Sequence, residues 1–217
     1  MRATAAAWIV GACTATAQAA DPSAIGEVLE HSQQQRLDAF HAAAEGPRAD
    51  AVRASFERLL QALAPGTSVE LRVIGGDTVA ETLQGHVIVA NERLADLEEG
   101  PRLFVLGHEL AHVMHDHWAA MGGVYRRWVP GAVTPERTDP VAGALGRDAS
   151  LLSHRQEFEA DAWALQMLRR LGVPGEAAVG AFLSLGAQMD TVTHPATRKR
   201  VAALRALIAE SAEDAGR

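Results

Sequence analysis

The sequence VLGHELAHV at residues 105–113 decides how this chain is interpreted, because it contains the pattern HExxH. On a helix, side chains four residues apart lie on the same face, so His108 and His112 can direct two imidazoles at one metal ion. Glu109 can then act as a general base beside a metal-bound water. The same pattern also fits two unrelated histidines on an amphipathic helix, so the rest of the sequence has to decide.

A second acidic segment, EFEAD at residues 157–161, offers the missing ligand. A catalytic zinc ion takes three protein ligands and keeps one position open. We expect Glu157, on a second helix, to complete the coordination. Asp161 lies four residues further along the same face and can accept a hydrogen bond from the distal nitrogen of a ligand histidine. A solvated acidic face is the ordinary alternative, but HExxH upstream favours the ligand.

The length and composition of the chain are typical of one globular domain. The chain has 217 residues, of which 48% are hydrophobic and 22% charged, which suits a single domain with its own core. The net charge is −7 and the longest basic cluster is Arg198–Arg200, so we expect no nucleic-acid partner. Cys13 is the only cysteine, which leaves core packing and a bound metal to stabilise the fold. The oligomeric state is left open.

Residues 1–20 are typical of a secretory signal, followed by one domain over residues 21–217. Arg2 precedes a run of small and apolar residues, and Ala17-Gln18-Ala19 has the form that signal peptidase cleaves. Val10–Cys13 resembles a lipobox, whose lipidated Cys13 would tether the protein to a membrane. That alternative signal is short, so soluble export to the periplasm or cell envelope is favoured over a membrane-anchored lipoprotein.

Hydrophobic periodicity predicts a mainly helical α+β fold with a small sheet ahead of the HExxH helix and a second ligand-bearing helix behind it. The expected elements are a helix from Pro47, strands at 69–73 and 86–89, a short helix at 91–97, and longer helices at 102–117, 154–171, 175–188 and from Pro195. Residues 118–153 are rich in Gly and Pro and show no periodicity. We therefore expect them to form a long irregular lid or plug over the metal.

Further motifs follow in a fixed order: His117 after the second histidine, Glu157-x-x-Ala160-Asp161, then Thr193-His194-Pro195 and Arg200. From about residue 48 to 207, this order resembles the HtpX and CAAX-prenyl-protease type of zinc metalloendopeptidase, a gluzincin family. Its small exported members of the BepA and LoiP type are similar in size and layout.

The resemblance implies a zincin-like domain with one Zn²⁺ ion bound by His108, His112 and Glu157. It implies Glu109 as the base, and Asp161, Arg200 and His117 as the residues that support the ligands. His194 would approach the metal, either to polarise the scissile carbonyl and its oxyanion or to cap the zinc at rest.

The chain departs from this family ahead of HExxH. Many relatives carry an Asn-Ala pair and a Gly-rich turn, whereas this chain has Thr78-Val79-Ala80 and Leu83–His86. The departure affects how an active-site strand receives substrate. We expect an extended peptide to pair with the strand near His86–Val89.

These observations together predict a zinc-dependent endopeptidase that cleaves exported or envelope proteins, misfolded ones among them, through a zinc-activated water with Glu109 as base. Two alternatives stay open. One is a zinc-bound, self-plugged, chaperone-like binding protein of the envelope with little proteolysis, in which His194 closes the site. The other is zinc-dependent hydrolysis of a different substrate, such as cell-wall peptide.

Overall fold

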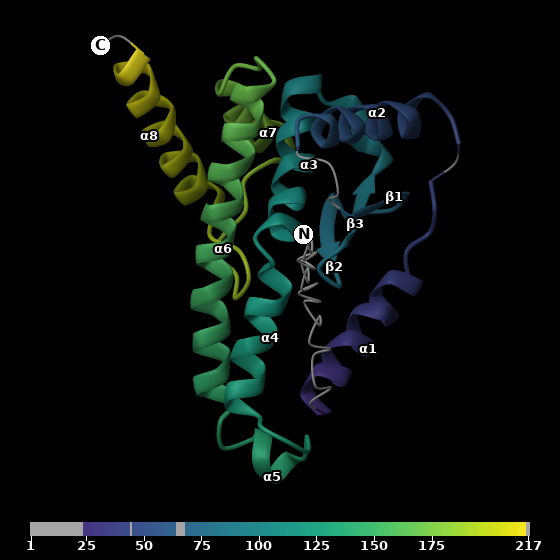
Figure 1. The fold of residues 1–217 in the computed structure, drawn as a ribbon, viewed down its shortest axis with the longest axis vertical. Coiled ribbons are helices and arrows are strands. Elements are labelled where there is room, and N and C mark those ends of the chain that lie inside the picture. Colours follow the sequence, from purple (N-terminus) through teal and green to yellow (C-terminus); the bar gives the residue numbers. More distant parts are fainter. Residues whose placement is uncertain (1–23, 44, 64–67, 216–217) are drawn as a thin grey trace, which may run out of the picture.

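The computed structural model describes residues 24–43, 45–63 and 68–215 (Figure 1). The expected signal sequence, including Cys13, lies outside the described residues. The elements, in chain order, are α1 (Ala24–Asp38), α2 (Pro47–Gln61), β1 (Glu70–Ile74), β2 (Ala80–Leu83), β3 (Val87–Asn91), the 3₁₀ helix η1 (Glu92–Asp96), α3 (Glu99–Met114), α4 (His117–Trp128), α5 (Pro135–Thr138), α6 (Ala142–Arg170), α7 (Glu176–Leu185) and α8 (Thr197–Ala215). The predicted mainly helical α+β class is confirmed.

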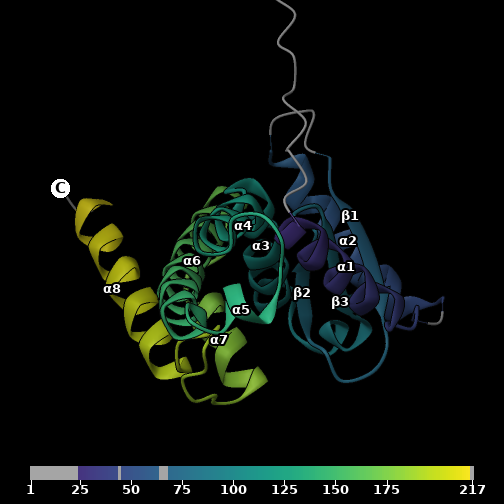
Figure 2. The ribbon, with the colours of Figure 1, turned by 90° about the horizontal axis from the view of Figure 1, so that it is seen from below.

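Helix α3 runs through the middle of the molecule, with α6 on one side and the sheet on the other (Figures 1 and 2). Every residue from Leu103 to Ala111 is buried, so this helix is apolar around most of its circumference. At the crossing with α6, a Cβ added to Gly107 would lie 3.5 Å from the Cβ of Ala164. Small residues on both helices therefore allow the segments around Gly107 and Ala164 to approach closely.

The sheet has three strands in the order β1-β3-β2, with β1 parallel and β2 antiparallel to β3. The continuous apolar strand β3 is buried at every position, as its central place requires. The expectation that substrate pairs with residues 86–89 is therefore wrong, because the backbone of β3 is already paired on both sides. The strand with a free edge beside α3 is β2, which the sequence analysis missed.

The turn from β2 to β3 needs its glycine. Gln84 and Gly85 both adopt left-handed backbone angles, with φ of 52° and 72°. A Cβ on Gly85 would also lie 3.1 Å from the Cβ of Trp118 at the start of α4. The turn is also held from α1, where the side chain of Gln34 accepts a hydrogen bond of 2.9 Å from that of Gln84.

The segment 118–153 is mostly helical, which corrects the expectation of an irregular connection. Gly122 and Gly123 lie inside α4, and Gly143 and Gly146 lie in the first turns of α6, which starts twelve residues before the predicted position of 154. Glycine in a helix costs only about 1 kcal/mol, and packing of α4 against α6 outweighs that cost. Trp118, Met121 and Ser153 line a cleft that His108, His112 and Glu157 also line. Whether the segment gates that cleft stays a prediction.

Helix α3 begins at Glu99 rather than near Arg102, because Pro101 falls in the first turn, where a helix has no use for its missing N–H. Among the residues that the structure describes, no helix combines the length and apolarity needed to cross a membrane.

Candidate metal centre

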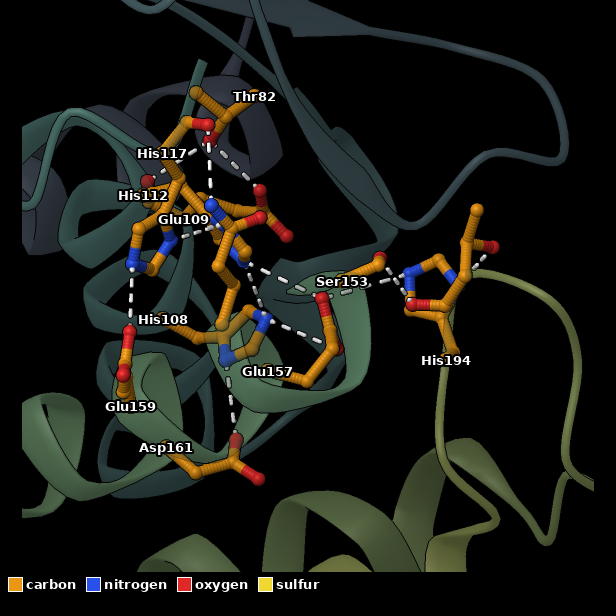
Figure 3. A network of polar contacts seen from close by, with 12 residues as sticks. Thr82, His108, Glu109, His112, His117, Ser153, Glu157, Glu159, Asp161 and His194 are labelled. Atoms are coloured by element: carbon orange, nitrogen blue, oxygen red, sulfur yellow. Dashed lines mark hydrogen bonds and ion pairs between the residues drawn. The ribbon is translucent and has the colours of Figure 1, made fainter. Parts of the chain in front are cut away.

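Two imidazoles and one carboxylate meet at the crossing of α3 and α6 (Figure 3). The Nε2 atoms of His108 and His112 are 3.2 Å apart. The Glu157 carboxylate lies 3.5 Å from His108 Nε2 and 3.4 Å from His112 Nε2, through its two different oxygens. In a tetrahedral zinc site with bonds of about 2.1 Å, neighbouring ligand atoms lie about 3.4 Å apart. Both the donor types and their spacing therefore fit a zinc ion.

His108 is fixed from behind by a buried ion pair. Its Nδ1 lies 3.0 Å from Asp161 Oδ1, so Nδ1–H donates to the carboxylate and the Nε2 lone pair faces the centre. Arg200 donates to both oxygens of Asp161 at 2.8 and 2.6 Å, and to Glu157 Oε2 at 2.7 Å. These contacts join α6 to α8 underneath the first histidine.

The charges around these carboxylates keep them ionised. Burial alone would raise the pKa of Asp161, but hydrogen bonds from Arg200 and His108 outweigh it and lower that pKa below its ordinary value. Burial likewise opposes ionisation of Glu157, yet the nearby His108, His112 and Arg200 lower its pKa strongly. The centre therefore offers an anionic oxygen at neutral pH, as a cation site requires.

His112 is held differently, through a second histidine. The Nδ1 atoms of His112 and His117 are 2.9 Å apart, so one of them donates and the other accepts. When His112 presents its Nε2 lone pair to the centre, its Nδ1–H must donate to His117, which then carries its own proton on Nε2. That Nε2 is buried and makes no hydrogen bond within the described residues, although Glu159 Oε2 lies 3.4 Å away. Burial first, and then His112 and His115, lower the pKa of His117 to about 4.

Glu109 is oriented by β2. Thr82 Oγ1 lies 2.8 Å from Glu109 Oε2 and 2.8 Å from the Glu109 carbonyl oxygen, so its single proton can satisfy either one. The sequence analysis missed Thr82 because it missed the strand that carries it. Strand β2 has only four residues, and an alternation of apolar and polar residues over so few positions does not identify a strand.

His194 lies beside the centre on the segment between α7 and α8 (Figure 3). Its side chain is 52% exposed and its Nε2 is 3.8 Å from Glu157 Oε1. It is not a member of the candidate ligand group, which within the described residues consists of His108, His112 and Glu157. Its Nδ1 is 2.8 Å from Thr193 Oγ1. The segment is anchored by Asp190, which accepts from the backbone N–H of Ala196 at 2.7 Å.

Comparison with protein families shows to which family the chain belongs. Residues 53–129 and 135–208 match the model of peptidase family M48, which covers more than half of the chain. The chain belongs to peptidase family M48. Peptidases of this family are zinc-dependent metallopeptidases that act on proteins or peptides, and the His-His-Glu group is where such a metal could bind. A search of curated proteins finds no match.

Proposed function

We propose that this M48 protein is a zinc-dependent metalloendopeptidase that cleaves exported or envelope proteins. The observation that carries the proposal is the group of His108, His112 and Glu157 with Glu109 beside it, open to a cleft of about 490 Å³. A purely structural zinc site normally closes its fourth position with a protein ligand and has no use for a base.

His108, His112 and Glu157 would hold the zinc ion, which when bound supplies Lewis-acid polarisation of water and of the scissile carbonyl. Glu109 accepts a proton as the water oxygen bonds to the carbonyl carbon. It then delivers this proton to the amine nitrogen as the C–N bond breaks. When Thr82 donates its proton to Oε2 rather than to the carbonyl oxygen of Glu109, it keeps the Glu109 carboxylate aimed into the cleft.

We infer that His194 stabilises the developing oxyanion. If Nδ1 accepts the hydroxyl proton of Thr193 at 2.8 Å, the ring proton is on Nε2, the atom that faces the metal centre. An N–H aimed at a developing negative charge contributes to catalysis in this way. The exposed ring could also turn to cap the metal in a resting state.

An extended substrate would pair with the free edge of β2. This strand is antiparallel to β3, and Ala80, Glu81 and Thr82 line the cleft beside the centre. Addition of a peptide strand to an open sheet edge gives main-chain hydrogen bonds without sequence selectivity, which suits a peptidase. Export of the protein, with or without a lipid on Cys13, is supported by the sequence of residues 1–20 alone.

The test compares the zinc-loaded mature chain with Glu109→Gln, which keeps the shape of the side chain but removes the base. We expect both to bind about one zinc ion, and casein cleavage to fall by roughly 10²- to 10⁴-fold in the variant. Binding of zinc with no cleavage by the wild type would favour the self-plugged binding protein. Absence of zinc binding in both would contradict the site itself.

A further inference from the structure

The backbone groups on the outer edge of β2 can be assigned residue by residue. The N–H of Asn91 donates to the carbonyl of Val79 at 2.8 Å, so these two residues pair through a main-chain hydrogen bond. In an antiparallel pair, residues bonded in this way alternate with residues whose N–H and C=O point away from the partner strand. Ala80 and Thr82 are residues of this second kind in the register of β2 with β3. Their N–H and C=O groups are therefore the ones that a substrate strand would bond.

The next outward-pointing N–H along this edge, that of Gln84, already has a partner. The carbonyl of Leu83 accepts from the N–H of His86 at 3.2 Å, on the side of β3. Because a trans peptide group points its N–H opposite to its C=O, the N–H of Gln84 points the other way, towards the outer edge. There it donates to Oε1 of Gln33 on α1. The Gln33 amide thus takes the place that a main-chain carbonyl of an added strand would take.

Helix α1 is held at this end of the sheet by an apolar contact and an ion pair. Leu37 is buried and packs on one face of the sheet, against Ile74, Leu83, Val87 and Val89. Arg36 forms an ion pair of 2.6 Å with Glu81 of β2. Gln33 and Arg36 also line the cleft that Glu109 lines. The residues that match the family model start at 53, so α1 lies ahead of the matched part of the chain.

We propose that Gln33 caps the substrate-binding edge of β2 and limits how far an extended substrate can pair with it. This inference rests on the proposed peptidase function and on strand addition to β2. A substrate strand bonds Ala80 and Thr82 directly, but pairing beyond Thr82 has to displace the Gln33 side chain from Gln84. A longer substrate therefore competes with α1 for one main-chain hydrogen bond, which is worth about 2- to 12-fold in affinity.

Two glutamines on α1 provide a matched pair for the test. Gln33 bonds the edge, whereas Gln35 is exposed and lines a hollow on another side of α1, with Val133. Gln33→Ala frees the N–H of Gln84, and Gln35→Ala removes the same atoms from the same helix without touching the edge. Alanine is the best helix former, so both variants should keep α1 intact. Gln33→Glu is a third variant, in which a carboxylate still accepts from the N–H of Gln84 and the cap stays.

The substrates are a short peptide and two derivatives of it, one extended at the N-terminal end and the other at the C-terminal end. An extension of about four residues reaches from Ala80 to Gln84, because an added strand pairs residue by residue. With zinc-loaded Gln33→Ala, we expect the KM of one extended peptide to fall by about 2- to 12-fold, with kcat unchanged. The KM of the short peptide should stay the same, and neither Gln35→Ala nor Gln33→Glu should lower that of the extended one. An unchanged or higher KM in Gln33→Ala, or an equal fall for all three peptides, would overturn the cap.

Binding measurements separate this inference from the peptidase proposal. If the wild type cleaves none of the three peptides, peptidase function fails. Fluorescence anisotropy of the same peptides on zinc-loaded Glu109→Gln, with and without Gln33→Ala, then still decides the cap. Tighter binding of one extended peptide by the double variant supports it. Equal binding by the two proteins, or binding of none of the peptides, overturns it.

Discussion

The two histidines of the candidate metal centre lie one helical turn apart on α3, yet the protein holds them by different means. His108 rests on a buried carboxylate that is itself clamped by Arg200, with hydrogen bonds between 2.6 and 3.0 Å. His112 rests on a neutral imidazole whose far nitrogen only approaches Glu159, a side chain that is 48% exposed. One candidate ligand is therefore fixed by buried charge, and the other by a neutral imidazole whose far side faces the exposed carboxylate of Glu159.

The origin of these supports in the sequence explains the difference. Asp161 lies 53 residues from His108 and Arg200 lies 92 residues away, so the support of His108 forms only when α6 and α8 have docked. His117 is only five residues from His112 and returns to it through Asp116, whose left-handed φ of 51° turns the chain from α3 into α4. The support of His108 is thus part of the tertiary fold, whereas that of His112 is local.

The largest effect is expected from Asp161→Ala, which removes the support of His108. Arg200 would lose one of its two buried carboxylate partners and keep only Glu157, so the loss of unfolding free energy should approach but not exceed the about 3–5 kcal/mol that an uncompensated buried charge costs. Zinc affinity should fall by roughly 10- to 100-fold, because Nδ1 of His108 loses its acceptor. Urea unfolding of the metal-free protein and competition with a chelator measure the two effects. A loss of stability no greater than that of His117→Phe would contradict the comparison.

His117→Phe should act on the metal more than on the fold. It keeps the apolar volume of the ring but removes the acceptor for His112 Nδ1–H, so we expect a loss of zinc affinity of about tenfold. His117→Asn offers an amide oxygen as acceptor and should recover part of that loss. An affinity equal to wild type in both variants would show that His112 needs no partner.

The two supports should also differ in their response to pH in the metal-free protein. Because folding lowers the pKa of His117 to about 4, its contribution to stability is complete above the unfolded value of about 6.5 and is lost as pH falls towards 4. The lowered pKa of Asp161 places its contribution above about 3.9, so that contribution is lost only in stronger acid. His117→Phe should therefore flatten stability between pH 6.5 and 4, measured by urea midpoints, and Asp161→Asn should leave that slope in place.

The parts of the site that could be predicted from the sequence are those carried by helical spacing. Each of the pairs His108–His112 and Glu157–Asp161 is four residues apart, so its two side chains share one face once the segment is predicted to be helical. Arg200 and His117 entered through the family resemblance alone. The contact between Glu159 and His117 could not be predicted, because the two residues are 42 positions apart and no motif in the sequence connects them.

The sheet and the segment 118–153 show where such reasoning fails. The strand order β1-β3-β2 depends on pairing between distant residues. The unbroken apolar run of β3 is typical of a central strand, but residues 86–89 were interpreted as a strand that pairs with substrate. Glycines in α4 and α6 were interpreted as breaks, but packing of the two helices against each other overrides their low helical propensity.

The smallest effect should come from Glu159→Gln, at the exposed end of the His112 support. Glu159 Oε2 is 3.4 Å from His117 Nε2, and its other oxygen is 3.5 Å from Arg155 Nε. An exposed contact of this kind contributes about 0–1 kcal/mol, so zinc affinity should change by no more than about fivefold. Arg155→Gln is the control, since it removes the competing cation and should shift zinc affinity, if at all, in the opposite direction.

Because salt screens exposed charges over about 8–10 Å near physiological ionic strength, the difference between wild type and Glu159→Gln should shrink from 0.01 M to 0.15 M salt, whereas the loss caused by Asp161→Ala should persist. An effect of Glu159→Gln as large and as salt-resistant as that of Asp161→Ala would mean that both histidines are held by buried charge, and the contrast between them would be wrong.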